Sequence, residues 1–239
     1  KSIGKLQKLR KLGLGHNQLT HLPNEILSLP KLEDLILSNN LSLQQLPDDI
    51  GLLEQLIYLN IEKTGITTFP QSIWNLKMIK EPNYLRNKGH HSYPLPPSPK
   101  GLDLSTAQFK IPKFLNHKSP TEKVEYILAS EEERKNIKWG YIQEKLESAK
   151  KYGELYLSGF QLQTLPIELE VLQDVPLKLI DLSDNELIEF PTFLEKIDTL
   201  KTLRLGYNQL TTVPNNINKF QQLKNLSLYG NQLTTLPDS

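Results

Sequence analysis

Histidine is the residue type in this chain best suited to hold a transition metal, and three histidines fall in one polar region. His90 and His91 are adjacent, and His117 follows them in the same lysine-rich part of the chain. A zinc site needs three or four ligands at characteristic spacings. Adjacent histidines in a loop are more often solvated, and no third ligand stands at a motif spacing. We therefore predict no metal site and no cofactor.

Two charged clusters are the other candidates for chemistry. Asp181, Asp184, Glu186 and Glu189 stand close together, and carboxylates are the ligands that calcium prefers. A weak calcium site is one interpretation, and a solvated acidic rim is the one that we prefer. The lysines of the other cluster are Lys100, Lys110, Lys113 and Lys118. They could bind a phosphate or a glycan, and we interpret them as a solvated surface.

Several classes of protein are disfavoured by what the sequence lacks. The 239 residues include no cysteine, which excludes disulfides, thiolate zinc sites and a catalytic thiol in this chain. No glycine-rich phosphate loop, G-x-S-x-G motif or kinase signature is present. The net charge of +1 gives no strong field for nucleic acid or a membrane surface, and no apolar run approaches the length of a membrane span. We predict a non-enzymatic protein with no nucleic-acid partner.

Any site must be positioned by a repeating pattern of leucines. The stretch from Leu200 to Leu223 follows LxxLxLxxNxL and then xxVPxxIxxFxx. The same order of residue types begins at Leu9, Leu32, Leu56, Leu177 and Leu223, at spacings of about 23 residues. In a strand, this alternation points the leucines to one face and the variable residues to the other. Each coil must cover its leucines with another coil, which predicts an elongated stack with parallel strands.

The sequence also predicts how each unit turns. Asn208 stands where the chain leaves the strand, and its amide can bond turn backbone groups that otherwise lack partners. Pro214 suits the first position of a short helical turn on the return path. Thr64 and Phe160 replace the asparagine in two units. We expect Thr64 to bond one backbone group and Phe160 to pack beneath its turn.

This pattern resembles the leucine-rich repeat superfamily, in its form of about 23 residues with LPxxIxxL in the return segment. The phrases NQLTTVP and NQLTTLP resemble tandem repeats of bacterial leucine-rich repeat proteins, including secreted and surface proteins of pathogens. The resemblance implies an α/β fold, a right-handed solenoid with its parallel sheet on the concave side and short helical turns outside. It also implies a protein-binding scaffold that uses the concave face.

The chain divides into three segments. Residues 1–119 hold N-terminal repeats, of which the last two are degraded; residues 120–151 are a helical insertion; and residues 152–239 hold C-terminal repeats. Within the insertion, the spacing of apolar residues predicts helices over 122–129 and 131–150, placed on the outer side of one coil. Ser130 is the expected start of the second helix, and Gly153 its end.

Both ends of the chain fall at nearly the same point of the repeat, without a polar capping unit. We expect the native protein to extend beyond both ends. The alternative is that the ends are covered by association.

We predict that a protein partner contacts the residues that flank the inward leucines of each strand. This set is Asp34, Ile36, Tyr58, Asn60, Glu62, Tyr156, Asp181, Arg204, Tyr207, Asn225 and Tyr229. Tyrosine and arginine dominate interface hot spots, although tyrosine is also simply a good strand residue. Arg204, Tyr207 and Tyr229 belong to adjacent units, so we expect one patch near the C-terminal end.

The function predicted from these observations is protein–protein recognition without catalysis. We expect a bacterial protein, secreted or at the cell surface, that binds a host protein; a cytoplasmic location is the alternative. A different function would be a regulatory or targeting domain of a larger ligase, kinase or GTPase. A third is self-assembly through open ends of the solenoid, since uncovered coils would bind one another.

Overall fold

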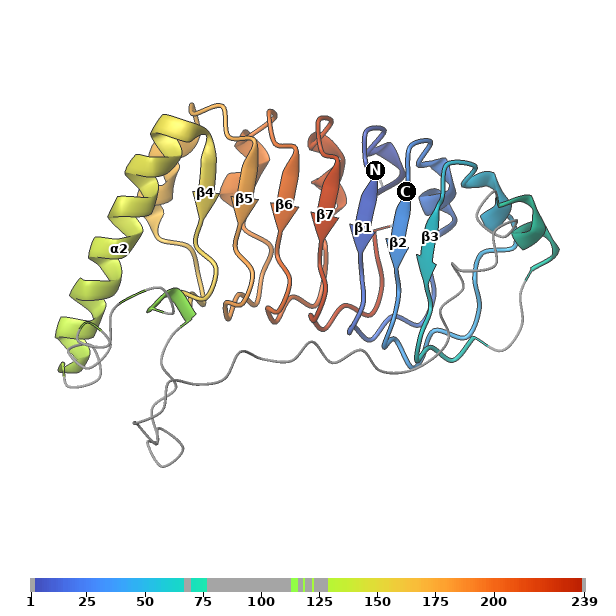
Figure 1. Ribbon diagram of the computed structural model, residues 1–239, viewed down its shortest axis with the longest axis horizontal. Coiled ribbons are helices and arrows are strands. Elements are labelled where there is room, and N and C mark those ends of the chain that lie inside the picture. Colours follow the sequence, from blue (N-terminus) through green and yellow to red (C-terminus); the bar gives the residue numbers. More distant parts are fainter. Residues whose placement is uncertain are drawn as a thin grey trace.

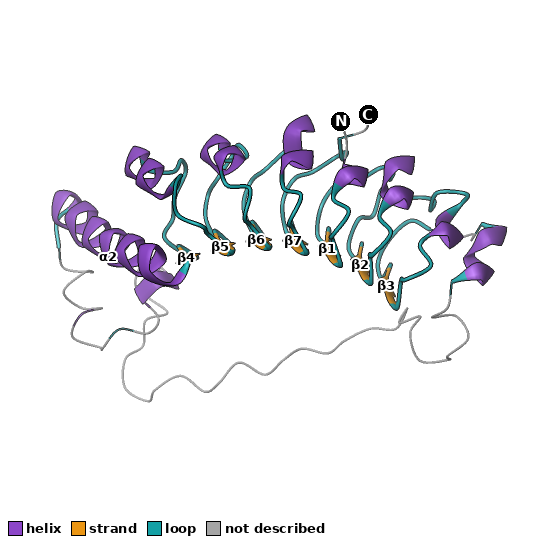
Figure 2. Cartoon of the chain, turned by 90° about the horizontal axis from the view of Figure 1, so that it is seen from above, coloured by secondary structure: helices purple, strands orange, loops and turns teal. Residues whose placement is uncertain are grey.

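The computed structural model describes residues 3–66, 70–76, 113–115, 118, 122 and 129–237. Seven short strands form one parallel sheet along the inside of an arc, with 3₁₀ turns outside (Figures 1 and 2). The strands are β1 (Lys11–Gly13), β2 (Asp34–Ile36), β3 (Tyr58–Asn60), β4 (Glu154–Tyr156), β5 (Leu179–Asp181), β6 (Thr202–Arg204) and β7 (Asn225–Ser227). This arrangement confirms the predicted α/β solenoid.

Among the described residues, the helical elements are short, with one exception. The 3₁₀ turns are η1 (Ile3–Lys5), η2 (Asn24–Ser28), η3 (Ile50–Leu52), η4 (Gln71–Asn75), η7 (Lys113–Leu115), η8 (Ile167–Leu172), η9 (Thr192–Lys196) and η10 (Asn215–Lys219). The exception is the helix α2 (Glu131–Tyr152). None of the helices in the described residues is both long enough and apolar enough to cross a bilayer.

The order of the strands in the sheet does not follow the chain. It runs β3-β2-β1-β7-β6-β5-β4, so β3 and β4, which follow one another among the described strands, form the two edges. We call the contact between the coils of β7 and β1 the central joint; it places Leu12 opposite Leu226. The two ends of the chain lie side by side at this joint (Figure 2). Any coil can cover another coil's leucines, so the stacking order is not tied to the order along the chain.

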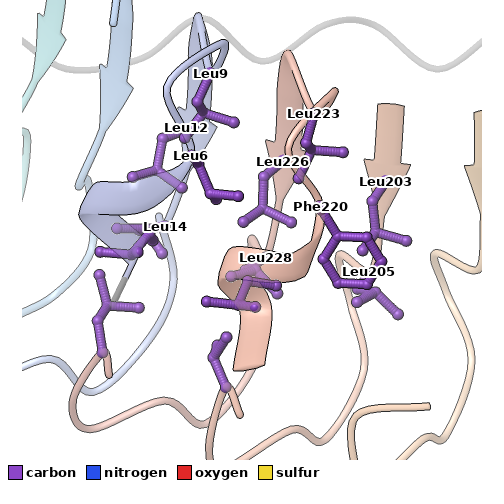
Figure 3. Close-up of a cluster of buried hydrophobic side chains, with 14 of the residues drawn as sticks. Leu6, Leu9, Leu12, Leu14, Leu203, Leu205, Phe220, Leu223, Leu226 and Leu228 are labelled. Carbon is purple, nitrogen blue, oxygen red and sulfur yellow. The ribbon is translucent and has the colours of Figure 1, made fainter. Parts of the chain in front are cut away.

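The core is a continuous stack of leucines that runs through the central joint. Leu203 and Leu205 on one side and Leu12 and Leu14 on the other are at most 1% exposed, and Leu226 between them is 2% exposed. Figure 3 shows this cluster, with side chains from both halves of the chain in one layer. Each fully buried leucine contributes roughly 1.5–3 kcal/mol, so the leucines at the joint stabilise the array on the same scale as those of the other coils.

Buried asparagines hold the turns together. Asn208 donates from Nδ2 to the carbonyls of Leu205 and Leu182, each at 3.0 Å, and its Oδ1 accepts from the Leu187 amide at 3.1 Å. One side chain therefore satisfies backbone groups of two coils that would otherwise be buried without partners. This confirms the predicted role of the asparagine.

The predictions for Thr64 and Phe160 are confirmed, and the prediction for Pro214 is not. Thr64 donates to the Ile61 carbonyl at 2.8 Å, and Phe160 is buried and stacks on Phe114 at a centroid distance of 4.5 Å. Pro214 differs from the prediction, because it lies one residue before η10 rather than at its first position. Its backbone is extended there, with φ −69° and ψ 148°.

The helix α2 begins and ends where the sequence predicts. The Ser130 side chain accepts a hydrogen bond from the Glu133 amide, and the Glu133 carboxylate accepts one from the Ser130 amide, which is a capping box. Gly153 follows the helix with a left-handed φ of 71°.

The position of α2 differs from the prediction. The helix packs against β4 and η8 at one end of the array rather than on the outer side of a coil (Figures 1 and 2). Ile142, Leu146 and Ala149 are buried in the main core. An apolar helix stripe needs an apolar surface, and the end coil provides one in its leucines. The helix predicted over 122–129 and the degraded repeats of 77–119 fall outside the described residues, apart from single positions and η7.

Candidate protein-binding face

Eight of the eleven residues predicted to contact a partner lie on strands of the concave sheet, and all eleven are exposed or half-buried. Register pairing aligns Tyr156, Asp181 and Arg204 in one row across β4, β5 and β6. Ile36 and Asn60 continue this row on β2 and β3. A parallel row holds Asn225, Asp34 and Tyr58, and the turns that follow the strands hold Tyr207, Tyr229 and Glu62.

Of the predicted patch of Arg204, Tyr207 and Tyr229, the two tyrosines are in contact, and they lie over the middle of the sheet. The prediction of a place near the C-terminal end is wrong, because β7 pairs with β1 as well as with β6. The N-terminal and C-terminal halves of the predicted set are therefore parts of one continuous surface.

Three aromatic rings meet at the centre of this surface. The Tyr207 and Tyr229 rings are 5.3 Å apart between centroids in an edge-to-face arrangement, and the His16 ring lies 4.7 Å from that of Tyr229. We call His16, Tyr207 and Tyr229 the aromatic cluster. His16 is absent from the predicted set, although it occupies the same repeat position as Tyr207. The segments LGHNQL and LGYNQL show this equivalence, and both residues have positive φ values of 52° and 53°.

Two glycines make room for the tyrosine rings. A Cβ on Gly15 would lie 2.4 Å from a ring carbon of Tyr229, and a Cβ on Gly230 would lie 2.7 Å from a ring carbon of Tyr207. Tyr229 therefore crosses the central joint and lies over the backbone of β1's coil. Burial raises the pKa of the Tyr229 phenol, and the neighbouring Tyr207 raises it further.

Ion pairs flank the aromatic cluster on both sides. Arg204 lies 3.1 Å from an Asp181 oxygen, and Lys11 lies 2.7 Å from an Asp34 oxygen. The hydrogen bond to Asp34 raises the pKa of Lys11. Exposed pairs of this kind contribute only about 0–1 kcal/mol to stability, so a partner can exchange them at small cost.

Basic side chains pair with two of the four carboxylates of the acidic cluster. Asp181 is held by Arg204, and Asp184 forms an ion pair with Lys113, whose Nζ also lies 5.9 Å from the Tyr207 centroid. Within the described part of the chain, no group of three or more His, Asp or Glu side chains is arranged to hold a metal. The other candidates, His90, His91, His117, Lys100 and Lys110, lie outside it.

The repeat, the parallel sheet and the asparagine-bonded turns agree with a sequence comparison. A family model described as a leucine-rich repeat region matches residues 1–91. The chain is a leucine-rich repeat protein. Repeat domains of this family are typically non-catalytic and bind proteins.

Known relatives of this leucine-rich repeat protein are partial matches. It is 38% identical over 76 residues to a probable disease resistance protein of Arabidopsis thaliana, which is 31% of this chain and 9% of that protein. A leucine-rich repeat protein of Leptospira interrogans is 30% identical, with 98% of this chain and 58% of that chain covered and a TM-score of 0.34. An internalin of Listeria monocytogenes is 18% identical with the same coverage and a TM-score of 0.31. The chain thus spans less than two thirds of each relative.

Proposed function

We propose that this leucine-rich repeat protein is a non-enzymatic recognition scaffold that binds a protein partner through its concave face, with the aromatic cluster at the centre. The observation that carries the proposal is the contact of three aromatic rings on an open surface. Tyr207 remains 55% exposed, so burial in the core does not explain its presence. Tyrosine offers a large contact area with a polar tip and little rotamer entropy to lose on binding.

The charges around the cluster suit a polypeptide partner. Arg204 and Asp181 lie on one side, and Lys11 and Asp34 on the other, so both signs are presented within one surface. A protein segment with an apolar or aromatic side chain between charged residues would fit this order of groups. Apolar contact at the centre and polar contact at the rim is the usual arrangement of a protein interface.

A finer part of the proposal concerns the biological setting. We propose a bacterial protein, secreted or displayed at the cell surface, that binds a host protein. The resemblance of NQLTTVP and NQLTTLP to repeats of such proteins supports it. Antibody labelling of intact cells of the source organism, compared with permeabilised cells, tests the location. Labelling that requires permeabilisation would contradict it.

The binding proposal is tested with variants that leave the central joint intact. Capture from candidate host extracts identifies partners, and titration then measures affinity for Tyr207→Ala, Arg204→Ala and the double variant. We expect the double variant to bind at least about tenfold more weakly, which is about 1.4 kcal/mol. Tyr152→Ala is the matched control, since Tyr152 is 62% exposed at the end of α2. Unchanged affinity of the double variant would place the contact elsewhere.

A further inference from the structure

The central joint joins two parts of the chain that are distant in sequence. The coils of β1, β2 and β3 form one half of the array, and the coils of β4 to β7 with α2 form the other. Within the part of the chain that the structure describes, the sheet joins the two halves only where β7 pairs with β1, and the Tyr229 side chain reaches further, to Ser38 of the β2 coil. Covalently, they are linked through the chain between β3 and β4, which are the opposite edges of the sheet.

The backbone contacts at the joint match those between consecutive coils. Across the joint, the Arg10 amide donates to the Lys224 carbonyl at 2.7 Å, and the Leu228 amide donates to the Gly13 carbonyl at 2.7 Å. One coil away, the Lys224 amide donates to the Lys201 carbonyl at 2.8 Å. The sheet therefore runs through the joint without a change of register.

The hydrogen bonds that buried asparagines make between neighbouring coils also continue across the joint. Asn17 donates to the Leu228 carbonyl at 3.0 Å, and its Oδ1 accepts from the Leu233 amide at 3.0 Å. Asn231 makes the same two bonds to the preceding coil, with the Leu205 carbonyl and the Leu210 amide, at 3.0 Å each. The faces that the two halves present at the joint therefore match one another as the faces of two consecutive coils do.

An open joint would leave both faces uncovered. Cover would be lost from Leu12, Leu14, Leu226 and Leu228, which Figure 3 shows together. The hydrogen bonds of Asn17 across the joint would be lost as well. Buried apolar groups and buried amides are both costly to expose without partners. Either half must therefore close against a matching half, and a second copy of this chain supplies an identical one.

We propose that the central joint is an exchangeable docking surface, and that its other occupant is the matching half of a second copy of this chain. In the exchanged form, the β7 face of each copy pairs with the β1 face of the other, giving two complete arrays in a reciprocal dimer. Every contact of the joint is the same in both forms, so the balance depends on concentration. Exchange of identical elements is a low-cost route to dimers.

Concentration decides the balance because the halves within one chain are tethered. A short flexible tether gives an effective concentration of the order of 1 mM, and longer tethers give less. Refolding at a few micromolar should therefore give the monomer, and refolding near 1 mM should give dimers in at least comparable amount. Light scattering after size-exclusion chromatography measures both species. A chain that stays monomeric after refolding at the higher concentration would overturn the proposal.

A crosslink shows whether the dimer uses the joint. The chain has no cysteine, and Lys11 and Asn225 are register partners across the joint at the spacing of neighbouring strands, which a disulfide can bridge. The Lys11→Cys and Asn225→Cys single variants are mixed, refolded together at high concentration and oxidised. We expect a covalent heterodimer. Lys11→Cys mixed with Thr202→Cys, one strand further away, is the matched control. Equal crosslinking in both mixtures would mean that dimers form through another surface, which overturns the proposal.

A locked chain provides the final measurement. The Lys11→Cys/Asn225→Cys double variant is oxidised as a dilute monomer, which ties the two halves of one copy together. After unfolding and refolding at high concentration, it should remain monomeric, and reduction should restore dimer formation to the level of the unmodified chain. Dimer formation by the oxidised form at the unmodified level would also overturn the proposal.

Discussion

At the scale of single residues, neighbouring positions of a strand have opposite roles. Leu205 is fully buried in the core, and Arg204 projects from the concave face with its side chain 47% exposed. We expect Leu205→Ala to lower the free energy of unfolding by about 2–5 kcal/mol, the usual range for a buried leucine. Arg204→Ala should change it by well under about 1 kcal/mol, because it removes only an exposed ion pair. Chemical denaturation of both variants measures this, and equal losses would contradict the observed burial.

A second prediction at the scale of residues concerns the stability of a Gly15 variant. A methyl group there meets the Tyr229 ring at 2.4 Å, so we expect Gly15→Ala to destabilise the fold by about 1–3 kcal/mol, the usual cost of overpacking. The cost should fall in a Tyr229→Ala background, and a double-mutant cycle from denaturation curves measures that coupling.

Gly13→Ala is the matched control for this cycle. A Cβ at Gly13 would meet Ser227 at no less than 3.6 Å, which is ordinary contact. We expect little change in stability from it. A loss equal to that of Gly15→Ala would mean that the tyrosine ring does not cause the cost.

Much of this residue-level detail was predictable, and the exceptions have a common cause. The asparagine role follows from its place in the repeat, because a buried turn leaves the same backbone groups unpaired in every coil. His16 could have been found from its equivalence to Tyr207. Its contact with Tyr229 could not, since that contact depends on which coils are neighbours and the repeat does not encode neighbours.

At the scale of elements, local sequence is sufficient to predict the limits of α2 but not its position in the fold. Its limits follow from Ser130 and Gly153, which satisfy the backbone groups at each end of the helix. Its place at the end of the array follows from an apolar surface that only the folded solenoid presents. The buried positions of α2 show that the helix contributes to the core of the β4 coil.

The helix allows a comparison between core packing and capping. Leu146 is 5% exposed, and we expect Leu146→Ala to lower the free energy of unfolding by about 2–5 kcal/mol. Ser130→Ala removes the cap at an exposed helix end and should cost about 0.5–2 kcal/mol. Denaturation followed by circular dichroism measures both losses. Native-state hydrogen exchange should show that Leu146→Ala also reduces amide protection in β4. If the amides of β4 remained equally protected in Leu146→Ala, the packing of α2 would not stabilise the β4 coil.

At the scale of the whole molecule, the repeat predicts the kind of architecture but not its order. All coils present the same leucines and the same asparagine, so the contact energy of β7 with β1 is about that of β6 with β7. What distinguishes one stacking order from another is the chain entropy of the connections, and a repeat pattern carries no information about that.

The order of the coils leads to a prediction about connectivity. In a permuted chain, residues 77–239 come first and residues 3–76 follow, with Asp238 and Ser239 between Pro237 and Ile3. This keeps two residues between the proline and the isoleucine, as between Pro23 and Ile26. The array then runs from β4 to β7 and on to β1, β2 and β3 in chain order. Each coil would follow its neighbour directly, so the joint would no longer require closure of a long loop.

We expect the permuted chain to have the same circular dichroism spectrum and a higher denaturation midpoint than the original. The gain should be about 1–2 kcal/mol, because loop-closure entropy changes only with the logarithm of loop length. It should also stay monomeric after refolding at high concentration, since the former joint is now covalent. A second permutant that retains Lys1 and Ser2, and so has four residues between the proline and the isoleucine, is the control for spacing. If the permuted chain were less stable than the original, with the control equally impaired, β7 and β1 would not be neighbours in the solution structure.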